Sequence, residues 1–244
     1  AINTNIYDPC NLDNDAVVDN TPGCEGLSDG AIKNEIASYD VISGGNPKLK
    51  PEEADNMTLG LVLQPMEDLS LTFDYFEIEQ TNVVFSSTEY VIDQNHIGNP
   101  IYADGVIRSA NGTGYIQTVF AVQNNIPERH VSGFDINANY RTSTGIGDFV
   151  FNLDATVVTT FDVQDVDGSP FRDVIGSYDN AFGSIPETKV NFQLDWSNNN
   201  LRATYDAAYV SEIAASDTDV MDSTLFHNAQ VGYYLEDYKV DLKL

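Results

Sequence analysis

Most of the chain alternates between apolar and polar residues with a period of two, a pattern typical of β-strands that have one apolar face. This alternation predicts eight long strands and one short helix. The strands are expected at 56–65, 69–80, 115–142, 147–163, 186–197, 200–212, 223–236 and 238–244. The helix is expected at 87–93, where Ser86 or Ser87 can cap one or two turns. We also expect a bulge or kink near Asn125-Ile126-Pro127, because proline cannot donate to a strand ladder.

The two faces of these strands differ in charge. Over the central parts of these strands, one face has forty positions and no charged residue, whereas the opposite face has thirty-nine positions of which thirteen are charged. Glu77 and Glu79 continue the apolar face of the second strand, as expected if that end has left the membrane. Strands of soluble proteins usually have five or six residues, but a tilted membrane strand needs about nine to eleven. Aromatic residues gather near both strand ends, with Tyr140 and Trp196 at short turns and Phe161 and Tyr209 at long loops. Two such levels are typical of outer-membrane barrels, although ordinary packing of a soluble core is the alternative.

The connections between the strands alternate in length. Short turns fall at 65–68, 143–147, 197–200 and 236–237, and long connections at 1–55, 81–114, 164–185 and 213–222. Membrane barrels follow this rule, with short periplasmic turns and long outer loops. The pattern therefore predicts an all-β fold, a transmembrane antiparallel up-and-down β-barrel.

The net charge of the chain excludes two classes of protein. The 38 acidic and 11 basic residues give a net charge of -27, which excludes a nucleic-acid binder and a polybasic membrane-surface protein. Mean hydropathy is -0.25 and no apolar run is long enough for a transmembrane helix. Of the net charge, -20 lies in four segments expected on the outer side. Those segments are 1–55 with -8 and 77–129, 162–185 and 211–224 with -4 each.

The two cysteines, Cys10 and Cys24, lie in a polar stretch rich in Asp, Asn, Gly and Pro. Such a pair predicts a disulfide that closes a small ring, and hence an oxidising compartment. Two free thiols are the alternative. No histidine lies nearby, so the pair makes a poor zinc site.

Two stretches resemble a known family. The sequence GGNPKLKPEEADNMTLG at 44–60 resembles the "GNPxLKPE" loop that leads into a barrel strand in TonB-dependent outer-membrane receptors. The sequence VSGFDINANYR at 131–141 is similar to a barrel strand of the same family. The resemblance covers most of 44–244 and is specific in 44–76 and 128–160.

The resemblance implies a larger protein than this chain. Such receptors hold an N-terminal plug domain inside a barrel of about twenty-two strands. Neither a plug nor a TonB box is recognisable here, and the final strand looks cut at Leu244. We therefore expect 56–244 to be part of a receptor barrel and 1–55 to be an extracellular loop with the disulfide.

The resemblance also implies a function and a location. It implies TonB-dependent active uptake of an unidentified nutrient, a carbohydrate, a peptide or a metal chelate, across the outer membrane of a Gram-negative bacterium. The implied partners are the TonB complex, outer-membrane lipid, lipopolysaccharide and the nutrient. The first alternative is a small passive porin or a structural or adhesive outer-membrane barrel. The second is a soluble β-sandwich lectin or hydrolase.

Acidic residues supply one candidate metal site. Asp162, Asp165 and Asp167, followed by Gly168, could give hard oxygen ligands to calcium, although their spacing is not that of an EF-hand. A solvated acidic loop is the simpler interpretation. Divalent cations that bridge such loops to anionic lipopolysaccharide would be one consequence.

Loop aromatics supply candidate ligand contacts. Tyr90, Tyr102, Phe171 and Tyr178 could stack on a sugar or another ligand, or could pack the loops against each other. A catalytic function has little support in the sequence. The histidines, His96, His130 and His227, belong to no nucleophile–base motif, and we expect no enzyme activity.

Overall fold

The computed structural model describes residues 8, 10, 39–109, 116–179, 181–216, 219–235 and 240–243. The chain divides into two compact units. Unit 1 comprises 1–53, 80–129 and 164–172, and unit 2 comprises 54–79, 130–163 and 173–244. Unit 1 thus joins the lead-in to 80–129 and to 164–172, whereas 173–185 belongs to unit 2. The extracellular position of 1–55 stays a prediction.

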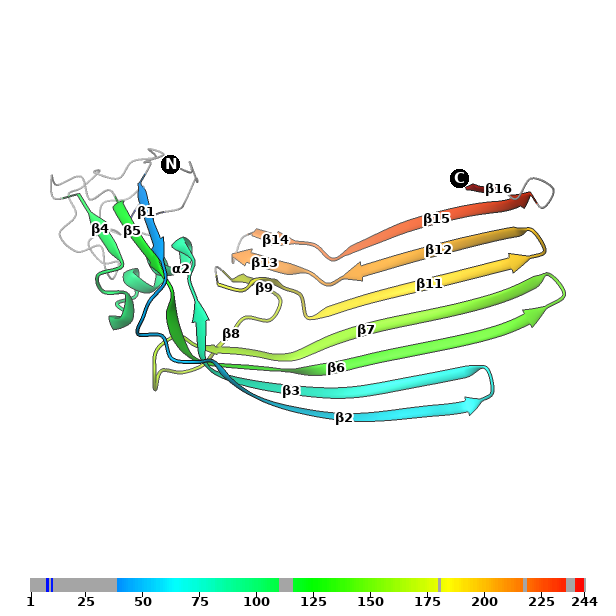
Figure 1. Cartoon of the computed structure of the whole chain (residues 1–244), viewed down its shortest axis with the longest axis horizontal. Helices are drawn as coiled ribbons and strands as arrows, with labels where there is room; N and C mark the ends of the chain where they lie inside the picture. The colour runs from blue at the N-terminus through cyan, green and yellow to red at the C-terminus, as the bar shows by residue number, and fades with distance from the viewer. Residues whose placement is uncertain are drawn as a thin grey trace. The chain divides into compact units, whose positions relative to one another are not determined.

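One long antiparallel sheet dominates unit 2 (Figure 1). Its strands are β2 (Glu53–Met66), β3 (Leu69–Phe85), β6 (Asn124–Thr144), β7 (Gly147–Gln164), β11 (Thr188–Asn198), β12 (Leu201–Val210), β15 (Thr224–Leu235) and β16 (Val240–Lys243). Their order is β16-β15-β12-β11-β7-β6-β3-β2, and the short β8 (Arg172–Asp173) pairs with β7. Neighbours in this sheet follow one another along the path, as in an up-and-down barrel wall.

A second, smaller sheet also belongs to unit 2. It contains β9 (Ser177–Asp179), β10 (Gly183–Ile185), β13 (Ile213–Ser216) and β14 (Asp219–Met221) in the order β10-β9-β13-β14. These short strands lie in the long connections that follow β7 and β12.

The register confirms the division into two faces. Phe192 of β11 lies opposite Leu153 of β7 and Ala207 of β12. The next residue, Gln193, lies opposite Asn152 and Asp206. Because side chains alternate between faces, Phe192 pairs with apolar residues on both sides and Gln193 with polar ones.

The apolar face of the long sheet is exposed. Leu59 has 73% of its surface exposed, and Phe134 and Leu225 have 44% and 53%. The buried hydrophobic residues of unit 2, among those described, lie near strand ends: Val163, Val174, Ile185 and Ile213. A soluble sandwich would bury this face, whereas a membrane strand presents it to lipid.

Close backbone approach explains one short turn. Gly147 follows the β6–β7 turn at φ +127°, and an added Cβ would lie 2.4 Å from the Ser197 carbonyl oxygen. The same turn is held by Trp196, whose Nε1 donates to the Ile146 carbonyl oxygen at 2.9 Å. Only glycine fits both the backbone conformation and the space.

Unit 1 contains a small mixed sheet and the helix. β5 (Ile116–Val122) pairs in parallel with β1 (Asp40–Gly44) and antiparallel with β4 (Val106–Arg108). Helix α2 (Thr88–His96) and the 3₁₀ turn η1 (Pro100–Tyr102) complete the described elements of this unit. Its buried hydrophobic residues include Val91, Ile92 and Val119. Within the described ranges, no helix has the length and hydrophobicity to cross a membrane.

Three expectations need correction. The strand expected at 115–142 is two strands, β5 and β6, which separate at Gln123 because β5 joins a different sheet. Pro127 lies inside β6, so the break is upstream of the expected kink. The helix is capped by Ser87, as expected, but extends to His96.

Candidate functional site

The "GNPKLKPE" stretch anchors unit 1 through polar contacts. The Asn46 side chain accepts the Lys48 amide at 2.9 Å, and the Glu52 carboxylate accepts the Val84 amide at 2.6 Å. Asn125 exchanges two hydrogen bonds with the Lys50 backbone, at 2.9 and 3.0 Å. These contacts explain the polar residues of the stretch as structural, since each satisfies a backbone group where two strands begin.

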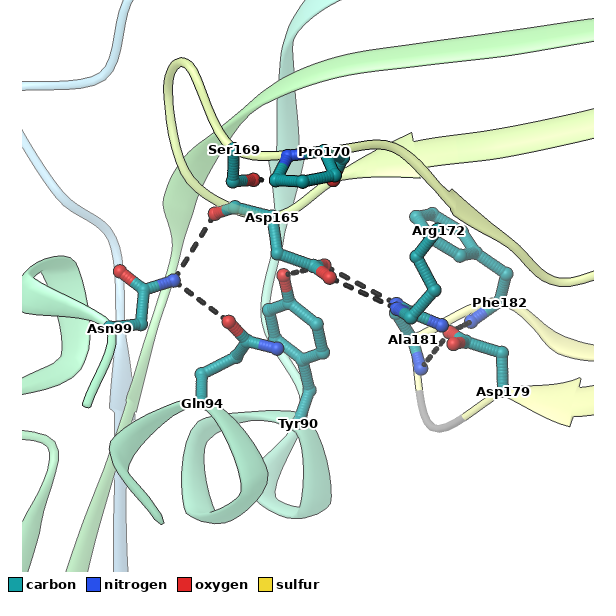
Figure 2. Close-up of polar contacts among 10 residues, drawn as sticks. All are labelled: Tyr90, Gln94, Asn99, Asp165, Ser169, Pro170, Arg172, Asp179, Ala181 and Phe182. Atoms are coloured by element: carbon teal, nitrogen blue, oxygen red, sulfur yellow. Dashed lines mark hydrogen bonds and ion pairs between the residues drawn. The ribbon is translucent and has the colours of Figure 1, made fainter. Parts of the chain in front are cut away.

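A buried polar cluster ties the segment after β7 to helix α2 (Figure 2). The Tyr90 hydroxyl donates to Asp165 Oδ1 at 2.7 Å, and Arg172 Nε donates to Asp165 Oδ2 at 3.0 Å. Asn99 Nδ2 donates to the Asp165 carbonyl oxygen at 3.1 Å and to Gln94 Oε1 at 2.8 Å. The Asp165 side chain is 12% exposed. We refer to Tyr90, Gln94, Asn99, Asp165 and Arg172 as the Asp165 cluster.

Burial controls the electrostatics of the Asp165 cluster and its neighbour. Desolvation, reinforced by the hydrogen bond to Asp165, raises the pKa of Tyr90 well above its ordinary value. Desolvation likewise raises the pKa of Tyr102 to about 12, and the charge of Asp165 adds to the effect. Both phenols stay protonated at neutral pH, so the Tyr90 hydroxyl can donate to the carboxylate.

The four candidate aromatics divide into two groups. Tyr90 and Tyr102 are 2% and 3% exposed and stack edge to face with ring centroids 5.6 Å apart. Their rings pack the loops and offer no face to a ligand. Phe171 and Tyr178 are 40% and 47% exposed. A ligand contact at those two positions stays a prediction.

The three candidate calcium ligands are not gathered at one point. Asp162 belongs to β7, Asp165 is engaged by Arg172 and Tyr90, and Asp167 is exposed. No group of three or more His, Cys, Asp or Glu residues within the described ranges could hold a metal. The carboxylate expected at the centre of the site therefore serves an internal ion pair.

Of the two cysteines expected to form a disulfide, the structure describes only Cys10. Cys10 is 1% exposed and disulfide-bonded. Cys24 and the acidic residues between the two cysteines fall outside the described residues. Beside Cys10, Asp8 accepts the Cys10 amide at 2.9 Å and forms a two-pronged ion pair with Arg108, at 2.7 and 2.9 Å.

The polar face of the long sheet carries a row of amides and carboxylates. Two shallow grooves of about 250 and 300 Å³ lie on this face and share Asn152, Asp154 and Gln193. Asn137 donates to Asp154 at 2.6 Å, and no basic residue lines either groove among those described. Such a surface suits contact with water, polar solutes or polar protein, and excludes contact with lipid tails.

Sequence reasoning missed the partners of the acidic segment. Arg172 is the single basic residue within 162–185, which is a signal that it pairs with a neighbouring carboxylate. The sequence gives no such signal for Gln94 and Asn99. Their role in the Asp165 cluster depends on burial beside a segment about seventy residues away. One histidine is also accounted for, since His227 Nδ1 lies 2.6 Å from the Tyr205 hydroxyl on the apolar face.

Comparison with known proteins places this geometry in a family. A family model described as TonB dependent receptor-like, beta-barrel, matches residues 26–244. The search of curated proteins gave no match.

Solved structures share the fold. The F5-1 variant of the FrpB iron transporter from Neisseria meningitidis is similar with a TM-score of 0.51 and 14% identity, over 79% of this chain and 26% of that one. The F3-3 variant gives 0.50 and 13%, over 80% and 25%. The siderophore receptor PirA from Acinetobacter baumannii gives 0.49 and 15%, over 80% and 27%. The chain thus spans about a quarter of these structures.

The family model covers most of the chain, including every strand of the long sheet, and the strand register agrees with a barrel wall. The chain belongs to the TonB-dependent receptor β-barrel family.

Proposed function

We propose that this chain forms part of the barrel wall and the outer loops of a receptor that takes up a nutrient across the outer membrane of a Gram-negative bacterium. The observation that carries the proposal is the long sheet with an exposed uncharged face and a polar opposite face. An uncharged face of this width suits lipid, and the polar face suits a filled or wet interior.

The proposed partners follow from the two faces and from the family. Outer-membrane lipid contacts the apolar face, and the TonB complex supplies energy through the N-terminal part of such a receptor. Lipopolysaccharide lies beside the acidic outer loops, where divalent cations would bridge the like charges. Loss of thermal stability when a chelator removes divalent cations would support the bridge. Unchanged thermal stability would contradict it.

The cargo is a small nutrient. The similar solved structures are named as a siderophore receptor and iron transporters, so a metal chelate is one candidate beside a carbohydrate and a peptide. At 13–15% identity this likeness concerns the fold, so the cargo has to be found by experiment.

Growth of a deletion strain tests the proposal. The strain lacking the full receptor is grown on single sources of carbon, nitrogen or iron, with and without a functional TonB. We expect a growth defect on at least one source, and an equal defect when TonB alone is removed.

The outcomes separate the rival functions. Uptake that requires the receptor but persists without TonB indicates a passive porin. Loss of surface attachment with unchanged growth indicates an adhesive barrel. Either result contradicts active uptake.

A further inference from the structure

Unit 1 carries a groove that the polar clusters described above do not use. The groove has a volume of about 490 Å³, and Ala121 of β5, which is 7% exposed, contributes to its lining. Ser43 and Gly45 contribute from the end of β1, and Ser86 and Thr88 from the start of helix α2. We call it the β1 groove. Its volume falls within the range of small-molecule sites, about 300–1,000 Å³.

The lining of the β1 groove is uncharged and rich in hydrogen-bonding groups. The hydroxyls of Ser43, Ser86 and Thr88 and the carboxamide of Gln123 can each donate and accept. None of these four side chains makes a hydrogen bond to another described residue. Ser87 differs, because its side chain accepts the Tyr90 amide as the helix cap.

The charges around the groove disfavour an anionic ligand. No lysine or arginine is among the described lining residues. The three arginines of unit 1 are engaged elsewhere, Arg108 with Asp8, Arg129 with Gln80 and Arg172 with Asp165. The N-terminus of helix α2 offers an anion a partial positive charge, but Glu89 already lies in its first turn, the lining supplies no cationic side chain and the surrounding segments are net acidic.

We propose that the β1 groove binds an uncharged polyhydroxylated ligand, a unit of a neutral oligosaccharide. Vicinal hydroxyls each donate and accept, and therefore match serine, threonine and glutamine side chains that do the same. The inference rests on the proposed function, since a receptor holds its cargo on the outer side before transport.

A glycine in the groove allows a clean test. An added Cβ at Gly45 meets no atom within 4 Å, and the backbone of Gly45 is not in the left-handed region. Because Gly45 is a lining residue, Gly45→Trp adds bulk at the edge of the groove without a backbone clash. Gly145, in the β6–β7 turn, meets the same two conditions, so Gly145→Trp is the matched control.

The experiment uses the full-length receptor, purified in detergent and applied to an array of immobilised neutral oligosaccharides. We expect at least one oligosaccharide to bind, with affinity reduced at least about tenfold by Gly45→Trp and less than about twofold by Gly145→Trp. Gln123→Ala should weaken binding about fivefold at an unchanged melting temperature, since one hydrogen bond is worth about 1 kcal/mol.

Two results would overturn the proposal: no neutral oligosaccharide binds, or binding survives Gly45→Trp. Array binding needs no energy source. If no oligosaccharide binds but growth shows a TonB-dependent defect, the groove proposal is contradicted and the uptake proposal is supported. If an oligosaccharide binds but growth shows no such defect, the groove proposal is supported and the uptake proposal is contradicted.

Discussion

The Asp165 carboxylate should control the local stability of the outer segment, and Asp165→Ala tests this. The substitution leaves the Tyr90 hydroxyl, in a residue only 2% exposed, without its acceptor at 2.7 Å. An unsatisfied buried hydroxyl costs about 1–3 kcal/mol. The lost ion pair adds less than about 1 kcal/mol, because the Arg172 side chain is 41% exposed.

The expected loss is thus about 3 kcal/mol in the free energy of local opening, which corresponds to an equilibrium constant for opening that is about 160-fold larger. Amide hydrogen exchange of helix α2 and of residues 164–172, measured in the full receptor in detergent, reports this change. Asp167→Ala is the control, because Asp167 is exposed and two residues away. Exchange in Asp165→Ala within twofold of the parent protein would refute the reasoning.

Three further outcomes are expected. Phe192→Lys, on the apolar face, should cost about 2–4 kcal/mol of folding free energy in bilayers and Gln193→Lys less than about 1, as measured by heat-modifiable gel migration. Unreduced protein should resist alkylation at Cys10 and Cys24, and reduction should cost about 3 kcal/mol, the value for a loop of about fifteen residues. Because burial raises the pKa of Tyr102 from 10.0 to about 12, its stabilising contribution is present below pH 10 and is lost as the pH rises through 12. An alkaline melt should show this loss, and Tyr102→Phe should reduce it to the part that buried Tyr90 causes.

The long sheet was predictable because its pattern is local. Alternation alone places Phe192 and Gln193 on opposite faces, and the register bears this out. The turn at Gly147 was visible for the same reason, since a tight turn selects its residues locally.

Unit 1 was harder to predict because its contacts join distant segments. β5 leaves the predicted strand at Gln123 to pair with β1, about eighty residues earlier, and no local pattern encodes that choice. Tyr90 and Tyr102 looked like loop aromatics because burial cannot be read from an irregular segment. Asp165 looked like a metal ligand because the sequence does not show which of the neighbouring carboxylates pairs with Arg172.

The central claim is that the uncharged face of the long sheet meets lipid, and a labelling scan of β11 tests it most directly. Residues 190–196 of the full receptor are replaced one at a time by cysteine, spin-labelled and measured in bilayers. The account predicts that Val190, Phe192, Leu194 and Trp196 are accessible to lipid-dissolved oxygen and protected from a water-soluble relaxant, with the positions between them protected from lipid. Equal exposure of both sets to the aqueous relaxant would contradict it.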